Sequence, residues 1–205
     1  MNDRFTYPVE RFKGFSDAVF AIAITLLVLK FALPASLPAK PTVSEEVGAL
    51  IAIWPQYLTY FVGFSTIGVV WLNHSALFRN ADNITHGIMI ANLLLLFFVV
   101  LMPLPTAVLE RFGLTRVSVV CYGLTLTAIA FSYVLLRSHF LAAHPSERTY
   151  RPALGLLTVP LFPIMTIVAY FKPLIGLLGF AVATIIAMLP RTIPMGQWRS
   201  PSNSA

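Results

Sequence analysis

Residues 11–29 read RFKGFSDAVFAIAITLLVL, so that a short polar segment runs directly into a long apolar one. The polar segment places an arginine, a serine and an aspartate at the mouth of a run that suits only lipid or a buried helix bundle. Ionisable groups at the edge of a membrane are costly, and they usually carry function. This stretch therefore indicates a membrane helix whose first turns hold a functional polar group.

The composition of the whole chain supports a membrane protein. Of its 205 residues, 58% are hydrophobic and only 11% are charged, about half the charged content of a soluble domain. So short a chain folding alone in water could not bury that much apolar surface. The net charge is +6. The basic residues are not clustered as in a nucleic-acid-binding surface, because they lie between the apolar segments. We predict an all-α integral membrane protein.

The apolar segments predict about six transmembrane helices per chain, since each approaches the ~20 residues that cross a bilayer. Their approximate bounds are 15–33, 44–78, 84–109, 117–136, 153–170 and 174–189. Pro55 is expected to bend the second helix or mark its leading turn, and Pro160 and Pro163 to kink the fifth. Residues 1–190 form one predicted transmembrane domain, and residues 191–205 a disordered tail.

The distribution of basic residues predicts the orientation in the membrane. An even number of spans puts both termini on one side, which receives nine of the 14 Lys and Arg residues: Arg4, Arg11, Lys13, Arg79, Arg137, Arg148, Arg151, Arg191 and Arg199. The other side receives Lys30, Lys40, Arg111, Arg116 and Lys172. Basic residues are enriched in cytoplasmic loops, so both termini are predicted to be cytoplasmic.

One face of the first helix carries a ladder of branched aliphatic side chains. At 100° per residue, Ile22, Leu26, Leu29 and Leu33 fall within an arc of about 60°, and Thr25 lies beside them. Taken alone, this stripe is an ordinary packing face of a helix bundle.

The pattern RxxxFSD, formed by Arg11, Phe15, Ser16 and Asp17 before a long apolar helix, resembles the signature of the transmembrane protein 175 family. These proteins are the potassium channels of endolysosomes and their prokaryotic relatives. The resemblance implies a homotetramer in the cell membrane, with no cofactor beyond permeant potassium ions and no enzymatic activity. It further implies that the first helices line the pore.

The same resemblance assigns roles to residues of the first two helices. Ile22 would be the main constriction, Leu26 and Leu29 would lie beyond it, and Thr25 would form a hydroxyl ring of moderate selectivity. On the second helix, a stretch that includes Trp71, Asn73 and His74 resembles the residues that bond to the motif. We hypothesise a network of Arg11, Ser16, Asp17, Trp71 and His74 that fixes how the first helix presents its pore face. In the alternative interpretation, Trp71 belongs to an interfacial aromatic belt and His74 faces headgroup water.

Other polar residues are expected to contribute less. His86, His139 and His144 fall in predicted loops without regular ligand spacing, and Asn92 and Ser132 are typical of interhelical contacts. No metal site is predicted. A proton-leak pathway, a secondary transporter and a structural bundle stay open as alternatives to the potassium channel. A metal-dependent membrane enzyme is disfavoured, because too few carboxylates and histidines converge.

Overall fold

The computed structural model describes residues 7–29, 38–145 and 159–188, and these residues form a bundle of α-helices. The helices in chain order are α1 (Val9–Val28), α2 (Val43–Ala52), α3 (Trp54–Leu77), α4 (His86–Leu101), α5 (Pro103–Phe112), α6 (Arg116–Ala143), α8 (Leu161–Phe171) and α9 (Pro173–Met188). Within these residues no sheet forms, and an isolated bridge joins Tyr7 to Ile84. The predicted all-α class is confirmed for this part of the chain. The predicted tail (residues 191–205), Lys30 and Leu33 lie outside the described residues.

Threonine residues cap the N-termini of α2, α4 and α6. In each case the hydroxyl oxygen accepts a hydrogen bond from a backbone N–H of the first turn, which satisfies a donor that the helix itself cannot; the residues are Thr42, Thr85 and Thr115. At α2 the Glu45 side chain also accepts from the Thr42 backbone N–H, so both partners complete a capping box. The sequence predicted this helix from residue 44, one residue after its observed start at Val43.

Prolines mark the starts of other helices, because the first turn does not need the N–H that proline lacks. Pro55 lies in the first turn of α3, and the axes of α2 and α3 differ by 45° at this break, which confirms the predicted bend. The predicted fifth helix, residues 153–170, lies only partly within the described residues, so a kink at Pro160 and Pro163 stays a prediction. Pro160 is the N-cap of α8 and Pro163 lies in its first turn, so the described helix begins at these prolines.

The described helices differ in how well they suit a membrane. By length and composition, His86–Phe112 and Arg116–Ala143 can cross a bilayer, and the bent α2–α3 pair makes a third span if it is counted as one. The α8 and α9 helices are shorter apolar helices of 11 and 16 residues, and the 20 residues of α1 include Arg11, Lys13 and Asp17. A six-span arrangement therefore stays a prediction.

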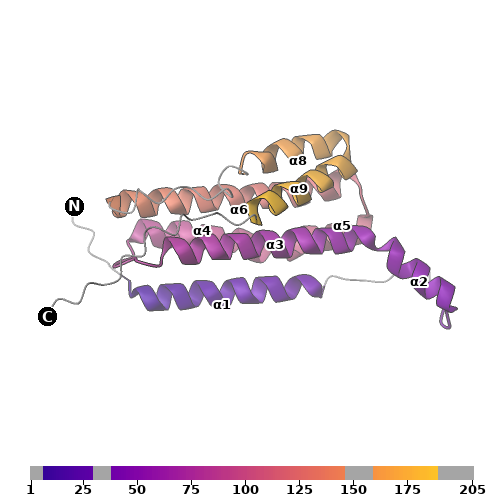
Figure 1. Cartoon of the computed structure of the whole chain (residues 1–205), viewed down its shortest axis with the longest axis horizontal. Helices are drawn as coiled ribbons and strands as arrows, with labels where there is room; N and C mark the ends of the chain where they lie inside the picture. The colour runs from indigo at the N-terminus through magenta and orange to yellow at the C-terminus, as the bar shows by residue number, and fades with distance from the viewer. Residues whose placement is uncertain (1–6, 30–37, 146–158, 189–205) are drawn as a thin grey trace, which may run out of the picture.

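The α1 helix lies along one side of the bundle, where it packs against α3, α4 and α5 (Figure 1). The hairpin of α8 and α9 packs on α6 and α3 instead. Small residues let these two short helices approach closely: a Cβ added at Gly176 would overlap Ala169, and one at Gly179 would overlap Met165. Since α8 and α9 pack on α6 and α3, the described helices cover α1 only on the side that faces α3, α4 and α5.

Candidate functional site

The buried face of α1 holds it against the bundle. This face consists of residues spaced three or four apart, namely Phe12, Ser16, Phe20, Ala23 and Leu27, and all are at most 4% exposed. Such spacing places side chains on one side of a helix. Because a membrane helix gains little from leaving lipid, close packing and hydrogen bonds must fix its position.

The opposite face of α1 is not covered by any described helix. Ile22 is 57% exposed, Leu26 is 38% exposed and Leu29 is 71% exposed, and Thr25 lies beside them. The Thr25 hydroxyl donates a hydrogen bond to the Ile22 carbonyl oxygen at 2.9 Å. Because its hydrogen is used inside the helix, the hydroxyl oxygen presents only lone pairs to an outside partner. This face therefore combines aliphatic side chains with an outward acceptor.

A chain of buried hydrogen bonds links α1 to α4 and α3. The Ser16 hydroxyl donates to the Phe12 carbonyl oxygen at 3.0 Å and accepts from Asn92 Nδ2 at 2.9 Å. Asn92 Oδ1 then lies 3.0 Å from His74 Nε2. Since the Asn92 amide nitrogen serves Ser16, its oxygen can only accept, and the bonded Nε2 of His74 carries the hydrogen. These hydrogen bonds form one continuous series from His74 Nε2 to the Phe12 carbonyl oxygen, and each bond has a donor and an acceptor.

Aromatic rings enclose the histidine of this chain. The ring of His74 lies 5.9 Å from that of Phe12, 5.5 Å from that of Phe20 and 4.8 Å from that of Phe78. Phe12 and Phe78 also meet edge to face at 4.8 Å. Offset and edge-to-face ring pairs add stabilisation beyond simple contact. The imidazole is therefore held in both position and orientation.

A second link between α1 and α3 lies at the edge of the exposed face. Trp71 Nε1 donates a hydrogen bond to Asp17 Oδ1 at 2.8 Å. Asp17 is exposed and Trp71 is 39% exposed. The bond satisfies a carboxylate that would otherwise face lipid or water alone, and it ties the two helices together beside the buried chain.

Three residues of the hypothesised site do not join these contacts. Arg11 and Phe15 lie on the exposed face of α1, and Arg11 has no side-chain partner within the described part of the chain. Asn73 lines a cavity between α3, α6, α8 and α9 instead of contacting α1. Its position follows from helix geometry, because Asn73 precedes His74 by one residue and so points about 100° away from it.

The structure adds Asn92, which the sequence reasoning treated as an ordinary interhelical contact. Asn92 is 0% exposed and bonds to both Ser16 and His74. Its one signal in the sequence is that it stands alone as a polar side chain in the apolar run IMIANLLLLFFVV. The predicted loop positions of His86 and His139 are wrong, since His86 is the first residue of α4 and His139 lies within α6. Among the described residues, no three His, Cys, Asp or Glu side chains are grouped so that they could hold a metal ion.

The Asp17 hydrogen bond gives a first testable prediction. Trp71→Phe keeps an aromatic ring but removes the donor, and we expect it to lower the free energy of unfolding by about 1 kcal/mol, because the bond is charge-assisted but solvent-accessible. The melting temperature in detergent should fall by about 2–4 °C. Trp54→Phe on the same helix is the matched control, since Trp54 is similarly exposed. Equal shifts for both variants would contradict a specific role for the bond.

Known proteins are similar to the part of the chain that carries this arrangement. The family model described as endosomal/lysosomal potassium channel TMEM175 matches residues 11–103, which contain α3, α4, all but the first two residues of α1 and the whole network above. A potassium channel of Chamaesiphon minutus is 37% identical over 135 residues, and one of Streptomyces collinus is 36% identical over 133 residues. Over these residues the chain is similar to the TMEM175 family.

The extent of the match differs between TMEM175 relatives. The chain spans 64% and 63% of the length of these two bacterial relatives, and the alignments cover 63% of the chain itself. The mouse endosomal/lysosomal proton channel TMEM175 is 34% identical over 155 residues, 70% of this chain but 30% of that protein. The crystal structure of a lysosomal potassium-selective channel TMEM175 homolog from Chamaesiphon minutus superposes with a TM-score of 0.68 at 29% identity. That superposition covers 87% of this chain and 95% of the other.

Proposed function

We propose that the protein is a potassium-permeable cation channel, in which four copies surround a pore lined by α1. The observation that carries this proposal is the two-sided character of α1. One face is fixed to α3 and α4 by hydrogen bonds, and the other exposes Ile22, Leu26 and Leu29 with no described helix over it. Closed cyclic symmetry would bring four such faces around one axis.

The exposed residues suit a narrow and weakly selective pore. A ring of four Ile22 side chains would exclude water at the throat, and a hydrophobic constriction of this kind closes a pore by dewetting. Leu26 and Leu29 would extend the apolar path. At Thr25 the outward lone pairs would replace part of the hydration shell of a passing cation, since its hydroxyl hydrogen is already bonded to Ile22. This chemistry favours cations over anions and predicts only moderate selectivity.

The buried chain of hydrogen bonds would set the rotation of α1. A helix that turned by one residue position would move Ile22 by 100° away from the axis. Ser16 and Asp17 bond to two different helices, and together they oppose such a rotation. We infer that these residues act as positioning residues for the pore face.

The names of the relatives support an ion channel but differ in the ion that is conducted. The two bacterial relatives are named potassium channels, and the mouse relative is named a proton channel. A proton pathway is therefore the second candidate function. We further propose a multi-pass protein of the cell membrane with both termini in the cytoplasm and a channel domain of residues 1–190.

Ion flux from liposomes that contain the purified protein tests this function. We expect potassium to pass faster than sodium by a modest factor, and a large organic cation to be excluded by the throat. Proton flux without potassium flux would favour the proton pathway. Saturable flux that depends on a co-transported solute would instead indicate a transporter.

Thr25→Val provides the specific prediction for selectivity. Valine matches the shape of threonine but lacks the oxygen. The ratio of potassium flux to sodium flux should therefore fall about threefold or more, which corresponds to about 0.6 kcal/mol. Thr127→Val on α6 is the control, because Thr127 packs near Thr166 on the other side of the bundle. Unchanged selectivity in the Thr25 variant would contradict its role in the pore.

A further inference from the structure

A cavity lies between α3, α6, α8 and α9, on the side of α3 that Asn73 faces. Its empty volume is about 450 Å³ including its mouth, which falls within the range of pockets that hold small molecules. The hydrogen bonds of the α1 site use Trp71 and His74 of α3 instead. The cavity is therefore separate from the exposed face of α1.

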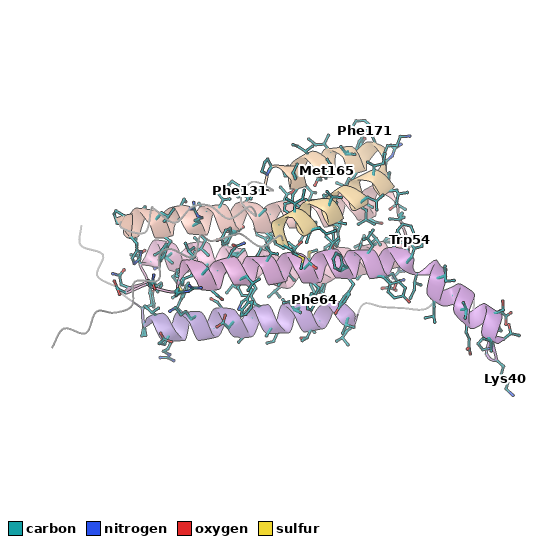
Figure 2. The ribbon with its side chains drawn as sticks, in the orientation of Figure 1. Lys40, Trp54, Phe64, Phe131, Met165 and Phe171 are labelled. Atoms are coloured by element: carbon teal, nitrogen blue, oxygen red, sulfur yellow. The ribbon has the colours of Figure 1, made fainter. Side chains whose placement is uncertain are left out.

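The cavity lies at the middle of the two longest described helices. Ile129 and Ala130 lie midway along the 28 residues of α6, and Thr66 lies midway along the 24 residues of α3. Phe131, which follows Ala130, is 65% exposed and lies where the α8–α9 hairpin ends along α6 (Figure 2). The middle of a spanning helix lies in the hydrocarbon core, so a molecule that enters from the side comes from the bilayer and not from water.

The wall of the cavity is mostly apolar. Val70, Ile129 and Phe162 present aliphatic and aromatic side chains, whereas Ala130 and Ala187 contribute only a methyl group each. Wall atoms that face empty space lose their dispersion contacts. Packing contacts matter greatly in a membrane bundle, because helices there gain little from leaving lipid. A bound molecule with an apolar body would restore the missing contacts.

Two uncharged polar groups lie at different levels of the cavity. Thr66 Oγ1 and Thr184 Oγ1 are 3.0 Å apart, so these two hydroxyls largely satisfy each other. Asn73 follows Thr66 by seven residues, about 10 Å along α3. Within the described part of the chain, the Asn73 amide has no hydrogen-bond partner. Asn73 therefore offers a ligand both a donor and an acceptor.

We propose that this cavity binds a small neutral amphiphile, namely an alcohol of medium length. Its hydroxyl group bonds to the Asn73 amide, and its alkyl chain lies along Val70, Ile129 and Phe162 toward the threonine pair. A charged ligand does not fit, because no described lining residue carries a charge that would compensate it. A hydrocarbon would leave the Asn73 amide unpaired. This proposal goes beyond the channel function and does not depend on it.

Photolabelling of the whole chain in liposomes tests the site. The probe is an octanol that carries a diazirine on its alkyl chain, and mass spectrometry locates the labelled residues. We expect label on Val70, Ile129 or Phe162, and an excess of unlabelled octanol should remove most of it. Label on Phe131 should persist under the same excess, because an exposed position in lipid has no site to saturate. Label that is confined to exposed residues, or that octanol does not displace, would overturn the proposal.

A variant that fills the cavity provides the first control. Ala130→Leu adds bulk to the cavity wall and should abolish the displaceable label. Ala128→Leu makes the same change about 160° away around α6, outside the cavity, and should keep the label. Equal labelling of the two variants would contradict binding in the cavity.

The polar contact is tested by a second variant, which decides the question even if Ala130→Leu fails to fold. Asn73→Leu should raise the octanol concentration that half-saturates labelling about fivefold, as expected for the loss of one hydrogen bond. A diazirine-bearing octane has no hydroxyl group, so its labelling should not weaken in this variant. Equal weakening of both probes would show that Asn73 does not bind the hydroxyl group, and the proposed alcohol site would be wrong.

Discussion

Replacing Asn92 with leucine is expected to lower the thermal stability of the protein markedly and to reduce its ion flux. Leucine fills the same space but leaves the His74 Nε2–H without an acceptor and the Ser16 hydroxyl without its donor from α4. Each buried group left unsatisfied costs about 1–3 kcal/mol, although bonds inside membranes are often worth less. We expect a loss of about 2 kcal/mol and a fall in melting temperature of about 4–8 °C in detergent.

Asn73→Leu is the matched control for this experiment. It makes the same chemical change on the residue next to His74, but Asn73 lines a cavity and has no bond to α1. Its effect should stay within about 0.5 kcal/mol. Equal losses for the two variants would show that any polar residue at this level stabilises the bundle, and the role of Asn92 in holding α1 would be wrong.

The second large effect is expected at the proposed throat. Ile22→Asn exchanges an aliphatic side chain for a polar one of similar size, so the throat should stay wet. Potassium flux should then rise at least about tenfold, which corresponds to a barrier lower by about 1.4 kcal/mol. A large organic cation should remain excluded, because the width of the pore changes little. Flux from liposomes under a potassium gradient measures both.

Ile167→Asn on α8 is the control for the throat variant. Ile167 is 64% exposed, comparable to Ile22 at 57%, but it lies on a helix that does not contact α1 in the bundle. This variant should leave flux unchanged. If both variants raise flux equally, leakage through a disturbed bilayer would explain the result, and a pore along α1 would be contradicted.

The local sequence predicted those features that depend on chain-neighbour physics. The long apolar runs and low charge of the chain predict a membrane protein. In lipid no water is available to the backbone, and a helix satisfies its N–H and C=O groups within one segment. Pro55 bends the α2–α3 pair as predicted, because a proline removes a backbone donor wherever it stands. The same rule does not tell that Pro160 stands at the start of α8, because the first residue of that helix is known only from the structure.

The contacts between helices could not be derived in this way. The sequence places Ser16 and His74 on separate helices, and it cannot give the residue that joins them. Asn92 takes that position because α4 packs beside α1 with Asn92 facing Ser16, a register that depends on the packing of every neighbouring side chain. Asn73 and His74 are adjacent in sequence, yet only the rotation of α3 in the bundle decides that His74 faces α1.

By itself the sequence determined that the chain is helical and apolar, with a polar motif at the start of its first apolar helix. Helix periodicity and hydrophobicity are local properties. It also determined that Ile22, Thr25, Leu26 and Leu29 share a side of one helix. Only the tertiary structure decided which side of α1 is locked to its neighbours and which is left uncovered. That choice depends on contacts between residues far apart in the chain, such as the hydrogen bonds from Asn92 to Ser16 and from Trp71 to Asp17.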